Sequence, residues 1–179
     1  MSYGLNIGDK TPDFKYVTPW VSDLNFYESI NNTTGILIFL RYIGCPICQL
    51  EMSNIRKNIN LTDKKSIKVF VVLQSSPEII SSLCSSDEWP FEIICDSEEK
   101  IFKQYFVKSA SIIKYLHPSG LLAGIKAIFK GYKHGKFEGN EKQLPAAFII
   151  SNKKIITYVY YGKRINDIPQ LKKLVENIK

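Results

Sequence analysis

The chain has 179 residues, of which 45% are hydrophobic and 23% charged, a composition typical of a globular protein that buries a real core. Four cysteines are too few for a disulfide scaffold, and no apolar run approaches the roughly 20 residues of a membrane span. The start lacks the cationic and apolar regions of a secretory signal. We therefore expect one domain over residues 1–179, a cytoplasmic location, and any disulfide to be catalytic rather than structural.

The net charge of +7 is unevenly distributed along the chain. Residues 1–102 carry a net charge of −4, residues 103–143 carry +6 and residues 144–179 carry +5. A basic half could hold an acidic partner or an anionic surface. A face of solvated lysines is the simpler interpretation, and we expect neither a nucleic acid nor a membrane as partner.

Strands and helices alternate through most of the chain. Continuous apolar runs predict strands, proline or acidic residues mark helix starts, and the polar turn SNKK predicts a hairpin. In chain order we predict strand 35–43, helix 46–60, strand 67–73, helix 77–84, strand 91–95, helix 97–106, strands 146–150 and 155–161, and a last helix from residue 167. This order predicts an α/β fold with a central mixed sheet, flanked by helices and carrying antiparallel edge strands.

Residues 107–143 interrupt the alternation. The spacing there predicts an amphipathic helix. Its apolar face would carry Leu121, Ile125, Ile128, Phe129 and Tyr132, and another face would carry Lys126, Lys130 and Lys133. Such a helix could lie on a membrane surface. A segment of this kind more often packs its apolar face on its own core, and that is our expectation for this one.

Two cysteines follow the first core strand in RYIGCPICQLEM, residues 41–52. Pro46 suits the first position of a helix, which makes Cys45 the expected N-cap. Free amides and the helix dipole at an N-terminus favour thiolate, and they can lower a cysteine pKa from about 8.5 to between roughly 3.5 and 7.5. Cys48 lies one turn further on the same face, within reach of a disulfide. The pair therefore indicates electron transfer, with Cys45 attacking and Cys48 resolving.

Other uses of the pair remain open. A zinc site would need further ligands, and Cys84 and Cys95 are eleven positions apart in apolar settings, where they are interpreted as small buried hydrophobes. His117 and His134 are isolated in the basic segment. We expect no metal and no organic cofactor. Packing of both thiols as ordinary core residues is the remaining alternative.

Several stretches resemble one known family. The strand–CPxC–helix unit, GDKTPDF, FLRYIGCPIC, EIICDSEEKIFKQYFV and LPAAFIISNKKIITYVYYGK are similar to the thioredoxin superfamily, specifically its peroxiredoxin-like (AhpC/TSA, or redoxin) branch. GKRINDIP resembles the tail of a subgroup that carries an insertion before the late strand, which here would be residues 107–143. The resemblance implies a thioredoxin-like fold, with Cys45 as the attacking cysteine and Cys48 as the second thiol. Pro145 matches the cis-proline region that faces the thiols in that superfamily.

Two positions depart from the family pattern. Tyr42 stands where peroxiredoxins usually have Thr or Ser, and the sequence Leu144-Pro145-Ala146 stands where they have an arginine. That Thr/Ser and arginine pair orients and polarises the peroxide in the family. Arg41 is the best substitute for the missing arginine, and Tyr42 could supply a hydroxyl, although a surface salt bridge and core packing are equally good interpretations.

Together these features predict a thiol-dependent oxidoreductase that cycles between the Cys45/Cys48 dithiol and disulfide. Its substrate would be a peroxide or a protein disulfide, and its reductant an external dithiol such as a thioredoxin-like protein. A homodimer is left open. The alternative is a non-enzymatic binding module that keeps the fold and uses its basic segment, residues 103–143, to hold an acidic partner.

Overall fold

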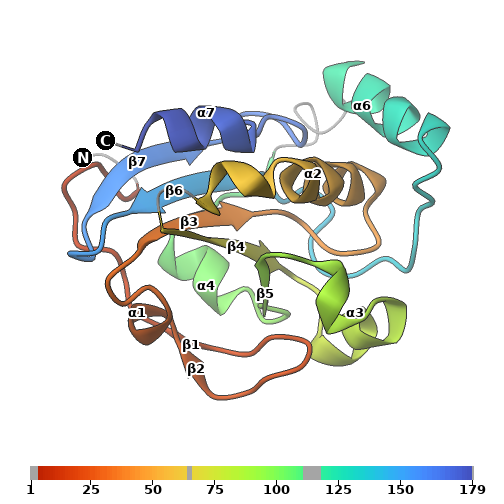
Figure 1. The fold of residues 1–179 in the computed structure, drawn as a ribbon. Helices are drawn as coiled ribbons and strands as arrows, with labels where there is room; N and C mark the ends of the chain where they lie inside the picture. Colours follow the sequence, from red (N-terminus) through yellow and green to blue (C-terminus); the bar gives the residue numbers. More distant parts are fainter. Residues whose placement is uncertain (1–3, 64–65, 111–117, 179) are drawn as a thin grey trace.

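A five-stranded mixed sheet forms the centre of the computed structural model, which describes residues 4–63, 66–110 and 118–178 (Figure 1). Its strand order is β5-β4-β3-β6-β7, with β3, β4 and β5 parallel and with β6 and β7 antiparallel to their neighbours. The strands are β3 (Thr34–Phe39), β4 (Ile67–Leu73), β5 (Glu92–Cys95), β6 (Ala146–Ile150) and β7 (Ile156–Tyr161). The predicted α/β class with a central mixed sheet is confirmed, and β7 forms the antiparallel edge.

Helices cover both faces of this sheet, which is why its inner strands are continuous apolar runs. Ile38 and Val71 belong to the core on one face, under α2 (Pro46–Lys57) and α7 (Leu171–Glu176). Phe39 and Phe70 belong to the core on the other face, with α1 (Phe26–Ser29) and α4 (Lys100–Gln104). Figure 1 shows α2 and α7 on one side of the sheet and α1 and α4 on the other.

Smaller elements complete the described chain. The helix α3 (Pro77–Leu83) and two 3₁₀ turns, η1 (Ile59–Leu61) and η3 (Ser86–Glu88), lie in the crossovers. A short hairpin of β1 (Lys15–Tyr16) and β2 (Leu24–Asn25) precedes α1. The sequence analysis missed this hairpin because its strands are only two residues long and carry no periodicity.

Two predicted helices begin later in the structure than in the sequence prediction. The carboxylate of Asp96 accepts the backbone N–H groups of Lys100, Ile101 and Phe102, so α4 begins at Lys100 rather than at residue 97. Asp167 does not start the last helix. Its carboxylate accepts the Tyr160 hydroxyl and a backbone N–H instead, and α7 begins only after the loop that contains a proline.

The helix predicted within residues 107–143 is present as α6 (Pro118–Phe129), but its orientation differs from the expectation. The small side chain of Ala127 is buried where α6 packs against α2, whereas Ile125, Ile128 and Phe129 are exposed. The apolar face therefore does not pack on the core. The side chain of Leu121 lies outside the described residues. Among the described helices, none has the length and apolar content needed to cross a bilayer.

Candidate active site

Cys45 is the N-cap residue of α2. The chain leaves β3 at Phe39, and Cys45 has an extended backbone (φ −79°, ψ 119°) directly before Pro46 in the first turn. Proline at this position loses no hydrogen bond and already has a helical φ, so the local sequence sets the helix start. The Cys45 sulfur accepts the backbone N–H of Cys48 at 3.3 Å. The predicted N-cap geometry is confirmed, while the catalytic role of Cys45 stays a prediction.

Cys48 lies one turn into α2, and its thiol donates a hydrogen bond to the Cys45 sulfur. This hydrogen bond, the Arg41 charge and the backbone N–H groups of Ile47 and Cys48 outweigh burial and lower the pKa of Cys45 to about 6. Burial and the hydrogen bond to Cys45 raise the pKa of Cys48 well above its ordinary value. Both cysteines are reduced. At neutral pH the arrangement therefore holds Cys45 as a thiolate and Cys48 as a thiol.

Arg41 places a cation directly on the Cys45 sulfur. One terminal nitrogen, Nη2, lies 2.9 Å from Cys45 Sγ, and the other, Nη1, donates to the backbone oxygen of Glu141 at 2.8 Å. The Glu141 carboxylate lies 3.4 Å from Nη1. Arg41 therefore forms a salt bridge with Glu141, but Arg41 itself is buried, so this is not the exposed surface pair that the sequence left open. Its Nε is buried with no hydrogen-bond partner in the described part of the chain, which leaves one donor for another molecule.

Tyr42 is fully buried, and its hydroxyl belongs to a polar network rather than to the apolar core. The hydroxyl donates to the Glu141 carboxylate and lies 3.2 Å from Nε2 of His134. Burial and the hydrogen bond to Glu141 raise the pKa of Tyr42, so the phenol stays protonated. Glu141 thus links Tyr42 to Arg41. Sequence reasoning missed Glu141 and considered His134 isolated, because nothing local connects them to residues about a hundred positions earlier.

The segment 133–141 covers the thiols. Gly135 donates its N–H to the Gly44 carbonyl at 2.9 Å, and a Cβ on Gly44 would lie 2.7 Å from the Lys136 carbonyl oxygen. Only glycine at position 44 permits this close approach without a shift of backbone. Cys45 has no exposed surface, so an oxidant can reach its sulfur only if neighbouring residues move.

Pro145 differs from the expectation for a cis proline. No described peptide bond is cis, so the bond between Leu144 and Pro145 is trans. Pro145 is buried immediately before β6, where Ala146 pairs with Phe39 at the end of β3 that leads to the thiols. The tertiary structure therefore selects the ordinary trans form, which X–Pro bonds favour by about 0.5–1 kcal/mol. Its role at the site stays a prediction.

The other two cysteines lie away from this site. Cys95 is buried in β5, and burial raises the pKa of its thiol to about 12. Cys84 is half-buried at the end of α3, and its thiol donates to the Ile80 carbonyl at 3.3 Å. Among the described residues, no three His, Cys, Asp or Glu side chains gather as metal ligands; His117 lies outside those residues.

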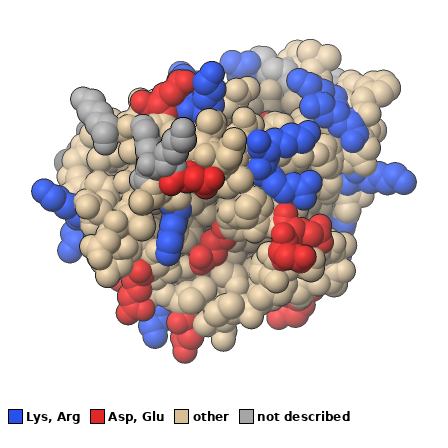
Figure 2. Space-filling model, viewed as in Figure 1, with Lys and Arg blue, Asp and Glu red and all other residues tan. Residues whose placement is uncertain are grey.

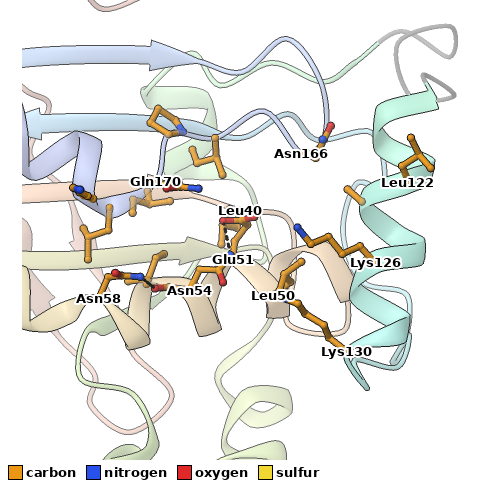
Figure 3. A pocket seen from close by; sticks show the side chains of 17 residues that line it. Leu40, Leu50, Glu51, Asn54, Asn58, Leu122, Lys126, Lys130, Asn166 and Gln170 are labelled. Atoms are coloured by element: carbon orange, nitrogen blue, oxygen red, sulfur yellow. Dashed lines mark hydrogen bonds between the residues drawn. The ribbon is translucent and has the colours of Figure 1, made fainter.

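A separate cleft of about 660 Å³ lies on the other flank of α2 (Figure 3). Its walls are α2, α6 and the loop before α7, and Figure 3 shows Glu51 of α2 in the same hollow as Lys126 and Lys130 of α6. Burial raises the pKa of Glu51, while the charges of both lysines act in the opposite direction. Neither Cys45 nor Cys48 lines this cleft. The covered thiol site and the open cleft are therefore distinct.

Comparison with known proteins assigns this chain to a family. A search among curated proteins finds no match. The model of the AhpC/TSA family matches residues 7–159. The solved structures of peroxidoxin BcpB from Mycobacterium tuberculosis and of a peroxiredoxin-like protein from Aquifex aeolicus both superpose with a TM-score of 0.66. The first is 11% identical in sequence, and the match covers 96% of this chain and 94% of that protein. The second is 19% identical, and the match covers 97% of this chain and 85% of that protein.

A yeast mitochondrial 1-Cys peroxiredoxin gives a TM-score of 0.65 at 17% identity, over 96% of this chain and 73% of its own. Identities this low carry the fold alone, whereas the family model covers most of the sequence that builds the sheet and the thiol helix. The chain therefore belongs to the AhpC/TSA family, and its fold is the thioredoxin-like fold of these peroxiredoxin neighbours.

Proposed function

We propose that this protein is a thiol-dependent oxidoreductase that cycles between the Cys45/Cys48 dithiol and disulfide. One observation carries the proposal: the Cys45 sulfur accepts both a backbone N–H of α2 and an N–H of Arg41, with a second thiol in hydrogen-bond contact. Both donors favour thiolate, which is the nucleophilic form of cysteine. Membership of the AhpC/TSA family supports peroxidase chemistry in particular.

With a peroxide as oxidant, the Cys45 thiolate attacks the terminal oxygen and the O–O bond breaks. Cys45 becomes a sulfenic acid, and the leaving alkoxide or hydroxide takes a proton to form an alcohol or water. The thiol of Cys48 then attacks the Cys45 sulfur, the S–O bond breaks and water leaves. With a protein disulfide as oxidant, the Cys45 thiolate attacks one of its sulfurs, the S–S bond breaks and the other sulfur leaves as a thiolate, so a mixed disulfide forms on Cys45. Cys48 then attacks the Cys45 sulfur, the mixed disulfide breaks and the second thiol of the oxidant is released. An external dithiol returns the pair to its reduced form.

Arg41 is placed to hold the oxidant, whereas Tyr42 is less suited to that role. The unpartnered Nε of Arg41 is a buried donor near the sulfur, where a peroxide oxygen would accept it. Tyr42 has its hydroxyl engaged with Glu141, so it is less free to orient the oxidant than the Thr or Ser of the family. We therefore expect slower peroxide reaction than in a standard peroxiredoxin, with disulfide exchange comparatively unaffected.

Stopped-flow measurement of both half-reactions tests the proposal. Reduced protein is mixed with hydrogen peroxide, or separately with a small model disulfide, and oxidation of Cys45 is followed in each case. The Cys45→Ser variant should lose both reactions, while a variant with Cys84→Ser and Cys95→Ser should keep both. If neither oxidant reacts with Cys45 faster than with a free thiol of the same pKa, the proposed function is wrong.

The physiological setting is part of the same proposal. The reductant would be an external dithiol such as a thioredoxin-like protein, and the location would be the cytoplasm. Titration with a purified thioredoxin and its reductase tests the first of these. In the presence of peroxide, the cofactor that supplies electrons to the reductase should be consumed continuously. Consumption that stops after one equivalent of this protein has been oxidised would contradict the proposed reductant.

A further inference from the structure

The outward face of α6 is apolar. Four large side chains on this 12-residue helix lie in contact with solvent: Leu122 is 65% exposed, Ile125 41%, Ile128 60% and Phe129 87%. At 100° per residue, Leu122, Ile125 and Phe129 fall within one narrow arc, and Ile128 extends it on one side. This contiguous apolar ridge is called the α6 ridge below.

The inward face of α6 is made of small residues. Ala127 is fully buried and Ala123 is partly buried, and this side packs against α2. An ordinary surface helix directs its large apolar side chains inward and its polar ones outward. In α6 the large side chains that the structure describes point outward instead, so the burial that contributes about 1.5–3 kcal/mol for each of them is not realised within the described residues. Exposed ridges of this kind mark interaction surfaces.

Lysines flank the α6 ridge and continue past its end. Residues 118–137 contain no Asp or Glu, and their lysines are exposed: Lys126, Lys130, Lys133 and Lys136. Figure 3 shows Lys126 and Lys130 projecting from one side of α6, where Glu51 is the carboxylate across the cleft. Residues 103–143 carry a net charge of +6 with Glu138 and Glu141 included, so the region stays positive when Glu51 is added. Figure 2 shows basic side chains gathered at the edge of the molecule where α6 lies in Figure 1.

We propose that α6 docks this protein on an anionic lipid surface. Leu122, Ile125 and Phe129 would enter the boundary between headgroups and acyl chains, and the lysines would lie among the lipid phosphates. A helix that combines an apolar face with flanking lysines binds such interfaces in this way. The cytoplasmic leaflet carries the negative surface potential that attracts these charges.

The charge pattern argues against a second copy of this chain as the occupant. A symmetric dimer through the α6 ridge would bring the lysines of both copies together, and like charges in an interface oppose association. A lipid surface is complementary in both respects, since it offers apolar chains and phosphates together. Docking on lipid replaces the sequence expectation that no membrane is involved. That expectation depended on burial of Ile125, Ile128 and Phe129 in the core, which the structure contradicts.

Vesicle sedimentation with the full reduced chain tests the proposal. The probes are vesicles of phosphatidylcholine alone and of phosphatidylcholine mixed with phosphatidylserine, at low and at physiological salt. We expect binding to the mixed vesicles only. Salt should weaken this binding, because the Debye length, over which charges attract each other, falls to about 8 Å at physiological ionic strength. Ile125→Gln with Phe129→Gln should abolish binding. The matched control is Leu83→Gln, which changes an equally exposed apolar residue on α3.

A charge series gives an independent readout. Each lysine near an anionic surface contributes about fivefold in affinity, so replacing Lys126, Lys130 and Lys133 with glutamine should weaken binding on the order of a hundredfold. The charge-matched control replaces three exposed lysines elsewhere: Lys57, Lys163 and Lys173. Circular dichroism verifies that each variant is folded, and the Cys45→Ser protein should bind like wild type because docking does not involve the thiols.

Three outcomes would overturn the proposal. The first is no binding of the wild-type chain to phosphatidylserine vesicles at low salt. The second is equal binding by a folded variant that lacks the apolar side chains. The third is a concentration-dependent dimer in analytical ultracentrifugation that the same two substitutions dissociate, which would assign the α6 ridge to a second copy.

Discussion

Replacing Arg41 with glutamine should raise the pKa of Cys45 by about one to two units. Arg41 Nη2 lies 2.9 Å from the Cys45 sulfur, and both groups are buried. A full unit charge at that distance contributes about 6 kcal/mol at an effective dielectric constant of ~20. That figure is an upper bound, because the guanidinium charge is spread over three nitrogens and is shared with Glu141.

The surroundings of Cys45 in the structure give a smaller value than this upper bound for the contribution of Arg41 to the Cys45 pKa. The pKa of Cys45 is lowered from 9.0 to about 6, a net effect of about 4 kcal/mol against an opposing contribution from burial. The hydrogen bond from Cys48 is the largest cause, and Arg41 and two backbone N–H groups supply the rest. Removing Arg41 alone therefore leaves the Cys48 hydrogen bond in place, and the Cys45 pKa should rise to between about 7 and 8.

The rate of iodoacetamide alkylation as a function of pH measures this pKa. Mass spectrometry of the digested protein assigns the label to Cys45 rather than to another cysteine. The matched control is Arg56→Gln, which removes an exposed arginine from the same helix that carries the thiols. An Arg41→Gln protein that is folded and still titrates near pH 6 would refute the assigned electrostatic role of Arg41.

Three further results are expected. Cys48→Ser should accumulate a sulfenic acid on Cys45 after peroxide treatment, detected by dimedone labelling; turnover at the wild-type rate would show that another thiol resolves it. Glu141→Gln should weaken the hydrogen bonds to Tyr42 and Arg41 and lower the free energy of unfolding by about 1 kcal/mol. It should also speed alkylation of Cys45, because the segment 133–141 would be held less firmly. If Cys45 is alkylated at the same rate in this variant and in the exposed control Glu176→Gln, Glu141 does not hold the segment over the thiols. Because folding lowers the Cys45 pKa, thiolate formation stabilises the native state as pH rises. The stability lost in Cys45→Ser should therefore grow by about 2 kcal/mol between about pH 5.5 and about pH 7.5 in urea titrations, and a pH-independent difference would argue against a native-state thiolate.

The chemistry of the thiol pair could be anticipated because it depends on neighbours in the chain. Pro46 starts α2, so Cys45 is placed at the N-cap and Cys48 one turn later by helix geometry alone. The alternation of apolar runs and helical spacing likewise predicted the five strands of the sheet within a few residues. Burial on both faces explains why those runs are continuous in β3 and β4.

Contacts between distant segments could not be anticipated in this way. Glu141 and His134 reach Tyr42 across about a hundred positions, and no pattern near either residue records the pairing. The contact between Arg41 and the Cys45 sulfur could not be predicted from the sequence either. A buried arginine four residues before the cysteine could have pointed away from it, and only the packing of the cover directs its guanidinium to the sulfur.

The sequence by itself determined the order of strands and helices and the placement of Cys45 at a helix N-terminus, since these follow from local sterics and periodicity. The family was indicated by the resemblance of several sequence stretches to known members. Only the tertiary structure decided that the Leu144–Pro145 bond is trans, that residues 133–141 close over the thiols and that α6 presents Phe129 to solvent. Periodicity identifies an apolar face without specifying what covers it. Here close packing of small residues such as Ala127 against α2 determined the orientation, and it left the large apolar side chains outside.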